Sequence, residues 1–320
     1  MKFATFKKNG HSAIGIVDTA RGEILDLSMA GDGNPAFRDM LSLIEAGAGG
    51  IAAAKAAAEA WDANAIVVLK DAKLLAPIPV PPQIRDASVY GTHIRQAPRG
   101  MQRLAARKRG DEAAAAKIEA DAEVPPTYKQ IPIYYITNRF SVIGPDATVT
   151  WPRYSDTMDF ELELGIFIGK TGSNIAKEKA ADHIFGYTIF NDFSARDQQM
   201  KEMQARLGPA KGKSFDTGNA VGPWIVTPDE LGDPQKLNVE VRVNGESWSK
   251  NTTAGMLHSF EDMIAYISTD ETLHAGELIG SGTVGNCCGL ELDRFLKDGD
   301  TVELEVEKIG ILRNKVVRPK

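Results

Sequence analysis

Two glutamates separated by one residue are the part of this sequence best suited to chemistry. Glu161 and Glu163 lie in the apolar, alternating segment DFELELGIFIG. Alternate side chains of a strand share a face, so both carboxylates should point the same way, roughly 7 Å apart. They form either a solvated acidic surface or a site that binds a ligand.

The segment 301–307, TVELEVE, has the same alternation and helps to separate these interpretations. Its polar face is polar throughout, which is typical of a solvated edge strand. Around Glu163 the same face continues into Gly165 and Phe167, and the other face is apolar too, which predicts an interior strand. Neighbouring buried carboxylates repel each other. A hard divalent cation such as Mg²⁺, Mn²⁺ or Ca²⁺ would relieve this repulsion, because it prefers oxygen ligands.

A third carboxylate, Asp192, ends the apparent strand GYTIFND, and a helix should follow directly. A carboxylate at a strand end suits a ligand or a catalytic group, but Asp192 or Ser194 could equally cap the helix. Arg196 and Gln199 are three residues apart in its first turn, so they share one helix face. Together they could hold an anionic group of a substrate.

The elements around these residues predict a mainly β fold with some helices. Residues 1–30 are typical of short strands, and several short apolar or alternating segments after residue 130 predict further strands. The proline-rich stretch LLAPIPVPPQIRD cannot lie inside a helix or a central strand. We therefore expect a small N-terminal α+β domain at 1–78 and a catalytic domain at 79–320. Helices are expected at 36–47, 50–61, 100–122, 194–207 and 259–268, the third as a solvated surface helix.

Composition excludes several classes of protein. The chain has 320 residues, 43% hydrophobic and 25% charged, which is typical of globular proteins. A formal charge of −6 gives no basic excess for binding nucleic acid. There is no signal-like start and no long apolar run, so we expect a cytoplasmic protein without a membrane partner. Adjacent cysteines such as Cys287 and Cys288 rarely form a disulfide, and no zinc motif surrounds them.

Five motifs occur in the order found in the fumarylacetoacetate hydrolase superfamily: MDFELELGIFIG, IFNDFSARDQQ, GKSFDTGNAVGPWIV, IGSGTVG and KIGILRNKVV. The resemblance covers roughly residues 80–316. It implies an α+β protein whose catalytic domain is a mixed β-sandwich or β-roll. It also implies a divalent metal such as Mg²⁺, a small oxo-acid substrate and a homodimer. Members include hydrolases of C–C bonds, decarboxylases, dehydratases and isomerases that share one metal site.

The resemblance assigns roles to individual residues. The metal ligands would be Glu161, Glu163, Asp192 and Asp86. His93, seven residues after Asp86, resembles the general base of the fumarylacetoacetase type, and Glu291 resembles the acid that orients it. Lys213 resembles the lysine close to metal and substrate. The positions that resemble substrate contacts are Arg196, Gln199, Thr283, Tyr90 and Thr217.

The function implied is hydrolysis of a C–C bond in a β-diketone or acylpyruvate-type oxo acid. The metal would polarise a carbonyl and stabilise an enolate, while His93 activates water. Decarboxylation, dehydration or isomerisation on the same site are alternatives, and a β-rich binding protein with structural Ca²⁺ is a non-enzymatic one. Ala87 and Ser88 replace the aromatic residues that follow the aspartate in the fumarylacetoacetase type. This difference argues against fumarylacetoacetate itself as the substrate.

Overall fold

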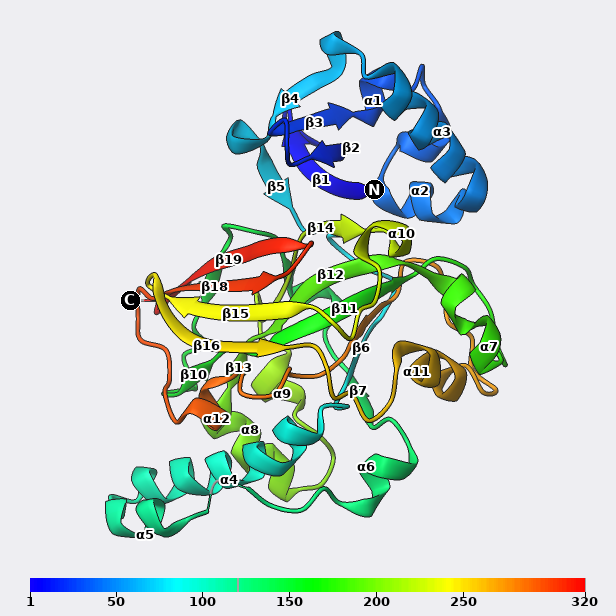
Figure 1. The fold of residues 1–320 in the computed structure, drawn as a ribbon. Helices are drawn as coiled ribbons and strands as arrows, with labels where there is room; N and C mark the ends of the chain where they lie inside the picture. Colours follow the sequence, from blue (N-terminus) through cyan, green and yellow to red (C-terminus); the bar gives the residue numbers. More distant parts are fainter. Residues whose placement is uncertain (120, 320) are drawn as a thin grey trace.

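The computed structural model describes residues 1–119 and 121–319. Residues 1–75 gather at one end of the molecule (Figure 1). Asn9 and Gly10 both adopt the left-handed backbone conformation that a tight hairpin between the first two strands requires. The elements of this part are β1 (Lys2–Lys8), β2 (His11–Asp18), β3 (Glu23–Asp26), α1 (Leu27–Ala30), α2 (Met40–Glu45), α3 (Gly47–Ala60), β4 (Ile66–Val68) and β5 (Lys73–Leu75).

A large mixed sheet joins the N-terminal strands to strands of the catalytic part, in the order β4-β3-β2-β1-β14-β12-β11-β17-β6-β7. In addition, β5 pairs with β1 and β8 pairs with β14. The N-terminal strands join it because β1 pairs with β14, with Phe3 opposite Ile225. The central strand β11 lies between β12 and β17 and is buried along its whole length, which confirms the interior strand predicted from its sequence. The remaining strands of this sheet are β6 (Ile84–Ala87), β7 (Tyr134–Ile136), β8 (Val142–Ile143), β11 (Leu162–Ile168), β12 (Ile184–Asp192), β14 (Asn219–Val226) and β17 (Leu278–Gly280).

A second sheet packs against the middle of the first one (Figure 1). Its order is β16 (Glu246–Thr252), β15 (Asn238–Val243), β18 (Thr301–Val306), β19 (Gly310–Val317) and β9 (Thr148–Thr150). The short strands β10 (Met158–Asp159) and β13 (Ser194–Ala195) pair separately. The expectation that 301–307 forms an edge strand is wrong, because β18 lies between β15 and β19. Its acidic face is partly exposed, and Glu303 and Glu305 pair there with Arg242.

The two faces of β11 enter different cores, as its alternation predicted. Leu162, Leu164 and Ile166 pack in the core between the two sheets. Phe167 belongs to a second core on the opposite face, together with Phe3 and helix residues of the N-terminal part. The two-sheet architecture with a smaller N-terminal part confirms the α+β fold predicted from the sequence.

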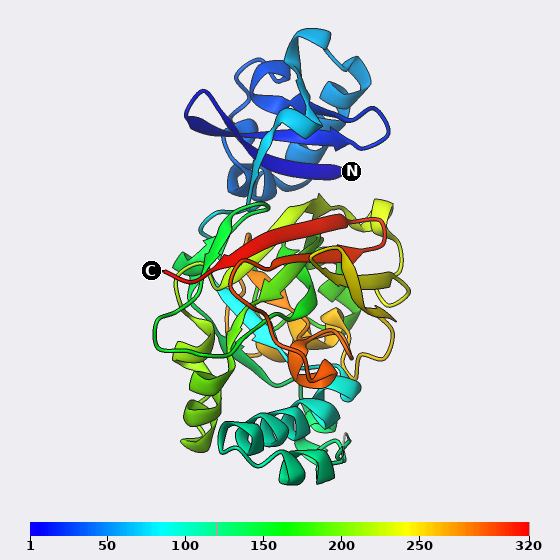
Figure 2. The ribbon, with the colours of Figure 1, turned by 90° about the vertical axis from the view of Figure 1, so that its left-hand side faces the viewer.

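The helices lie around the two sheets (Figures 1 and 2). Helix 194–207 is present as α8, and the helix at 259–268 as α11 with the capping box of Ser259 and Asp262. Within the described residues, no helix is long and apolar enough to span a membrane. The helices after residue 90 are α4 (Gly91–Lys108), α5 (Glu112–Lys117), α6 (Pro126–Gln130), α7 (Lys177–Ala180), α8 (Arg196–Gln204), α9 (Ala210–Lys213), α10 (Pro228–Leu231), α11 (Phe260–Ile267) and α12 (Gly289–Leu292). Short 3-10 helices span Pro35–Phe37, Ala63–Ala65, Leu69–Asp71, Arg139–Ser141 and Ala181–His183.

The helix expected at 100–122 differs in two ways from its prediction. It is two helices, because α4 begins at Gly91 and ends before the left-handed Gly110, after which α5 starts. It is also not simply a solvated surface helix. Leu104 is buried against Cys288 and Leu290, so α4 packs onto the segment that carries α12. This packing matters below, because α4 also carries His93.

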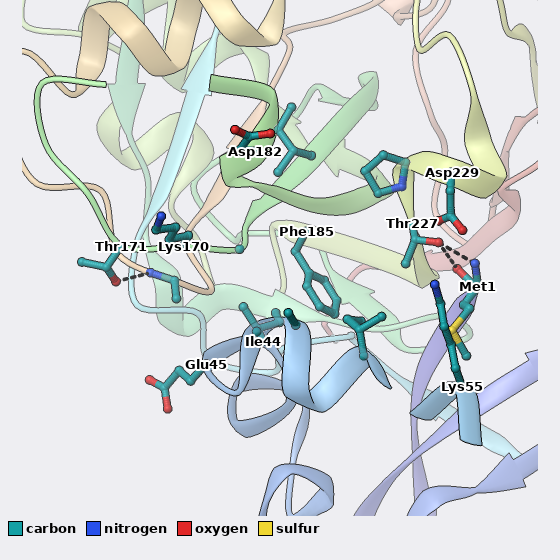
Figure 3. Close-up of a pocket in the computed structure, with 17 residues that line it drawn as sticks. Met1, Ile44, Glu45, Lys55, Lys170, Thr171, Asp182, Phe185, Thr227 and Asp229 are labelled. Atoms are coloured by element: carbon teal, nitrogen blue, oxygen red, sulfur yellow. Dashed lines mark hydrogen bonds between the residues drawn. The ribbon is translucent and has the colours of Figure 1, made fainter. Parts of the chain in front are cut away.

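A pocket of about 700 Å³ lies where the N-terminal helices meet the large sheet (Figure 3). Ile44 and Lys55 line it from α2 and α3, and Phe185 and Thr227 line it from the other side. None of the predicted site residues is among its described lining residues. The pocket therefore marks the junction of the two parts and not the predicted catalytic centre.

The shared core predicts that the N-terminal part and the catalytic part unfold together. Phe3 is fully buried, and its ring lies 5.9 Å from that of Phe185 across the junction. We expect Phe3→Ala to lower the free energy of unfolding by about 3–5 kcal/mol, measured by denaturant titration. Phe140→Ala is the matched control, since Phe140 is 72% exposed, and it should cost about 1 kcal/mol or less. Equal effects of the two substitutions would contradict a shared core.

Candidate active site

Three of the predicted carboxylates converge from neighbouring strands of the large sheet. Asp86 lies on β6, Glu163 on β11 and Asp192 at the end of β12, and one oxygen of each lies within 4.8 Å of the others. Between β6 and β11 runs β17, which places Gly280 beside Asp86. A Cβ atom at Gly280 would lie only 2.6 Å from an oxygen of Asp86 and from one of Glu163. The missing side chain therefore leaves the space into which the carboxylates point.

One oxygen of each carboxylate has no hydrogen-bond partner: Asp86 Oδ1, Glu163 Oε1 and Asp192 Oδ1. The other oxygens of two of them are held in place. Glu163 Oε2 accepts from the Gly282 amide at 3.0 Å, and Asp192 Oδ2 accepts from the Tyr135 hydroxyl at 2.5 Å. All three side chains are buried, and buried polar atoms normally have partners. Three buried carboxylates that lie close together, each with one unpartnered oxygen, fit a hard divalent cation.

The electrostatics of the cluster agree with this fit. Burial raises the pKa of Asp86 well above its usual value, and the nearby Asp192 raises it further. Burial also raises the pKa of Glu163 well above its usual value, and the charge of Asp86 adds to the effect. In Asp192 burial raises the pKa as well, although Lys213 opposes the rise. The ionised cluster is thus unfavourable alone, and a cation would stabilise it.

Glu161 lies beside this cluster but has different partners. Its Oε1 pairs with Arg196 Nη2 at 2.6 Å, and its Oε2 pairs with Lys213 Nζ at 2.6 Å. Burial would raise the pKa of Glu161, but Arg196, Lys213 and His93 outweigh burial and hold it below its usual value. Lys213 also contacts Asp192 Oδ2 at 2.6 Å, so it links Glu161 to the three carboxylates. The role of Glu161 as a fourth ligand stays a prediction.

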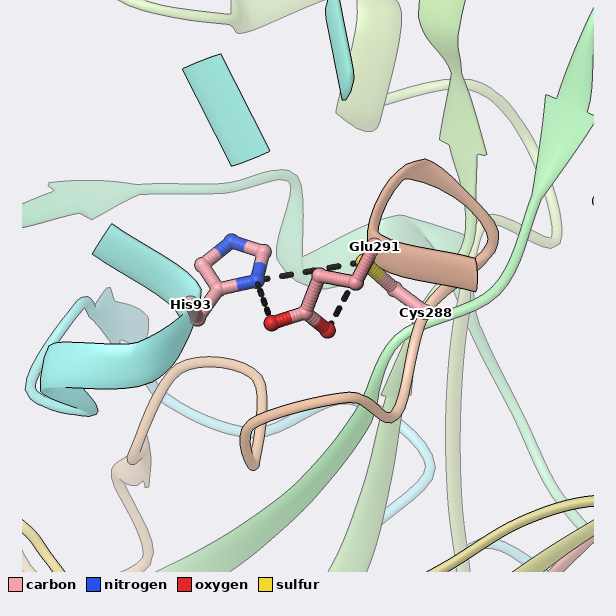
Figure 4. A group of neighbouring side chains, drawn as sticks. All are labelled: His93, Cys288 and Glu291. Carbon is pink, nitrogen blue, oxygen red and sulfur yellow. Dashed lines mark hydrogen bonds and ion pairs between the residues drawn. The ribbon is translucent and has the colours of Figure 1, made fainter. Parts of the chain in front are cut away.

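His93 and Glu291 come together from distant parts of the chain (Figure 4). His93 Nδ1 lies 3.4 Å from Glu291 Oε1, and His93 Nε2 lies 4.0 Å from Glu161 Oε1. The imidazole therefore faces Glu291 on one side and the charged network on the other. Its side chain is 14% exposed, whereas that of Glu291 is fully buried. The carboxylate is thus close enough to orient the imidazole, although no hydrogen bond joins the two in this structure.

The predicted substrate-contact residues fall into two groups. Arg196 is buried near the cluster and donates from Nη1 to Gln199 Oε1 at 2.9 Å, so these two residues form a pair. Thr283 is buried, and its hydroxyl has no partner. The hydroxyls of Tyr90 and Thr217 already form hydrogen bonds with the protein backbone. Tyr90 donates to the Thr253 carbonyl at 3.2 Å, and Thr217 accepts from the Thr150 amide at 2.8 Å.

Sequence reasoning missed three residues of this region. Asp159 accepts from Arg196 Nε at 2.7 Å and from the Gly289 amide at 2.7 Å, so it connects Arg196 to the start of α12. The alternation from Asp159 through Glu161 to Glu163 could have indicated it. Tyr135 on β7 and Cys288 before α12 gave no comparable signal, because only pairing between distant segments brings them here.

The chain is similar to a known protein family and to several known proteins. The family described as fumarylacetoacetate (FAA) hydrolase C-terminal matches residues 103–317. An uncharacterised protein of Archaeoglobus fulgidus is 40% identical over 187 residues, which cover 58% of this chain and 70% of that protein. The oxaloacetate tautomerase YisK of Bacillus subtilis is 35% identical over 206 residues, which cover 63% of this chain and 65% of that protein.

A solved structure is similar over its full length. The fumarylacetoacetate hydrolase from the psychrophile Exiguobacterium antarcticum is 28% identical and superimposes with a TM-score of 0.72, covering all of both chains. These findings confirm the resemblance drawn from the five sequence motifs. The family match extends over more than half of the chain and includes the strands that carry Glu163 and Asp192. The chain therefore belongs to the fumarylacetoacetate hydrolase family.

Proposed function

We propose that this protein is a divalent-metal-dependent enzyme that acts on a small 2-oxo acid or β-diketone through the enolate form of the substrate. The observation that carries the proposal is the convergence of three buried carboxylates, each of which has one oxygen without a hydrogen-bond partner. Asp86, Glu163 and Asp192 would hold Mg²⁺ or Mn²⁺, with Glu161 as a fourth ligand. The cation would supply Lewis-acid polarisation of the substrate oxygens.

The residues around the cation site would bind and orient the substrate. Arg196 and Lys213 are buried cations, and both sit where an anionic oxygen could replace one of their contacts with Glu161. Lys213 would donate a hydrogen bond to the oxygen on which negative charge develops. Gln199 and the free hydroxyl of Thr283 are placed to contact the substrate further. Tyr90 and Thr217 would act indirectly, because their hydroxyls hold the backbone of Thr253 and Thr150 in place.

The His93–Glu291 pair favours hydrolysis of a C–C bond. His93 would take a proton from water, and the resulting hydroxide would attack the carbonyl carbon. The C–C bond would then break, its electron pair would leave as the enolate of the second fragment, and a proton would complete that product. Glu291 would keep the imidazole in position and stabilise its protonated form.

Keto–enol tautomerisation is the second candidate, and the relatives favour it. Curated proteins 35–39% identical to this chain are oxaloacetate tautomerases, although the match spans only about 57–65% of their length. In this version His93 would move a proton between carbon and oxygen of one substrate, and no water would be activated. Both versions need the same cation and the same cationic side chains, so the substrate assay separates them.

Metal dependence is the first expectation for this site. Turnover of a panel of acylpyruvates, β-diketones and oxaloacetate should be lost in EDTA, because the Lewis acid that polarises the substrate oxygens would be removed. Adding Mg²⁺ or Mn²⁺ should restore it. The measurement is initial rate against free metal concentration. Full activity after exhaustive chelation, with metal content checked by elemental analysis, would rule out this role.

Glu163→Gln tests the carboxylate cluster without changing its shape. Removing the charge should weaken metal affinity by at least about 10–100-fold in calorimetric titration, since even outer-shell changes cost this much. Folding raises the pKa of Glu163, so its ionisation at neutral pH opposes folding of the metal-free protein. The variant should therefore melt no lower than the wild type in EDTA, and Mg²⁺ should no longer raise its melting temperature.

Glu305→Gln is the matched control for Glu163→Gln. Glu305 lies in the same alternating pattern, but its side chain is 42% exposed and pairs with Arg242. Its substitution should lower the free energy of unfolding by at most about 1 kcal/mol and leave metal affinity unchanged. Equal metal affinities of the two variants would remove the main support for the site.

His93→Ala tests whether His93 is the general base of the hydrolytic version. As a general base for water, His93 should contribute about 10²–10⁴-fold to kcat for a hydrolysed substrate. Calorimetric metal affinity should stay near the wild-type value, because His93 is outside the three-carboxylate group. The control is His11→Ala, an exposed histidine on β2. Unchanged hydrolysis in His93→Ala would show that another group activates the water.

A further inference from the structure

A second group of ligating side chains lies beside the carboxylates and contains sulfur. His93, Cys288 and Glu291 place one ligand atom each within 4.8 Å of the others (Figure 4). Cys288 Sγ lies 3.8 Å from His93 Nδ1 and 3.3 Å from Glu291 Oε2. His93 Nδ1 lies 3.4 Å from Glu291 Oε1. A nitrogen, a sulfur and a carboxylate thus form a small triangle.

The dimensions of this triangle resemble those of a tetrahedral zinc site. Zinc binds imidazole nitrogen and carboxylate oxygen at about 2.0–2.2 Å and thiolate sulfur at about 2.3 Å. With tetrahedral angles, such ligands lie about 3.3–3.7 Å from each other. The sulfur–nitrogen separation is 3.8 Å, and each of these two atoms lies 3.3–3.4 Å from a different oxygen of Glu291. A small rotation of the Glu291 carboxylate would bring one oxygen within reach of a cation held by both.

The surroundings of the triangle also favour a cation. Glu291 has a fully buried side chain, and its Oε1 has no hydrogen-bond partner. Burial raises the pKa of the Cys288 thiol, the carboxylates of Glu291 and Asp159 raise it further, and the Arg196 guanidinium partly offsets them. A bound divalent cation would act in the opposite direction. The partly exposed imidazole of His93 gives access from the surface.

We infer that His93, Cys288 and Glu291 form a binding site for a thiophilic divalent cation of the zinc class, separate from the three-carboxylate site. Three protein ligands leave the fourth position for water. The thiol proton would be released on binding. No local zinc motif surrounds the cysteines, because the imidazole comes from a residue 195 positions earlier in the chain.

Binding at this site would inhibit the enzyme. The cation would occupy the Nδ1 atom of His93 and the carboxylate of Glu291, so the imidazole could no longer be oriented by Glu291. This consequence rests on the proposed function of His93, whereas the binding itself does not. Hard cations such as Mg²⁺ prefer all-oxygen sites and should not compete here.

The adjacent cysteines provide a matched pair for the test. Cys287 and Cys288 are both fully buried, but Cys287 faces Ser249, with 3.7 Å between their side-chain atoms. The full-length protein, saturated with Mg²⁺, would be titrated with Cd²⁺, and the ultraviolet charge-transfer band of a cadmium thiolate recorded. The wild type and Cys287→Ala should show the band at one equivalent, and Cys288→Ser should not.

A second variant keeps the test informative if Cys288→Ser does not fold. His93→Ala should keep the thiolate band but weaken Cd²⁺ affinity by at least about 10–100-fold. Absence of the band in the wild type, or its persistence in Cys288→Ser, would overturn the site.

Inhibition is tested separately with Zn²⁺. It should inhibit the Mg²⁺-saturated wild type and Cys287→Ala, each compared with its own rate in the absence of zinc. If Cd²⁺ gives the thiolate band but Zn²⁺ does not inhibit the enzyme, the binding site stands and the proposed role of His93 is overturned.

Discussion

Like charges buried close together are the constraint on which the centre of this protein depends. Asp86, Glu163 and Asp192 are held on three strands of a sheet whose interior excludes water, so none of them can be solvated. The fold does not relieve their repulsion fully, because Lys213 reaches only one of the three, Asp192. Such an arrangement is costly in a protein without a ligand and favourable with a divalent cation, which is why the cluster indicates function and not stability.

The sequence predicted the part of this centre that follows from strand geometry. Period-two alternation placed Glu161, Glu163 and Phe167 on one face of β11 and Leu162 on the other, and the cores on the two sides bear this out. The same logic failed for 301–307, because alternation reports which face is solvated and not which neighbours a strand has. An interior strand whose one face is open to solvent, such as β18, has the same pattern as an edge strand.

The meeting of His93 with Glu291 could not be derived from local patterns. It depends on α4 packing against α12, and that contact requires a close approach at Gly100, where a Cβ atom would lie 2.2 Å from the Leu290 carbonyl oxygen. The helix expected at 100–122 was placed too late and too near the solvent, since its alanines and charges resemble those of a surface helix. Only the family resemblance pointed to the histidine, and it did so through spacing from Asp86.

The balance of charges in the site indicates the order in which the cation and the substrate bind. Five carboxylates, those of Asp86, Asp159, Glu161, Glu163 and Asp192, face two buried cations, Lys213 and Arg196. The cationic side chains are therefore already occupied by carboxylates, and an anionic oxo acid would meet excess negative charge. A divalent cation among Asp86, Glu163 and Asp192 would remove most of this excess and would lessen the need of Asp192 for Lys213. The lysine would then be free to turn toward the substrate. On this reasoning the cation binds before the oxo acid. The buried repulsion that makes the metal-free cluster unfavourable also makes the oxo acid bind selectively to the metal-loaded enzyme.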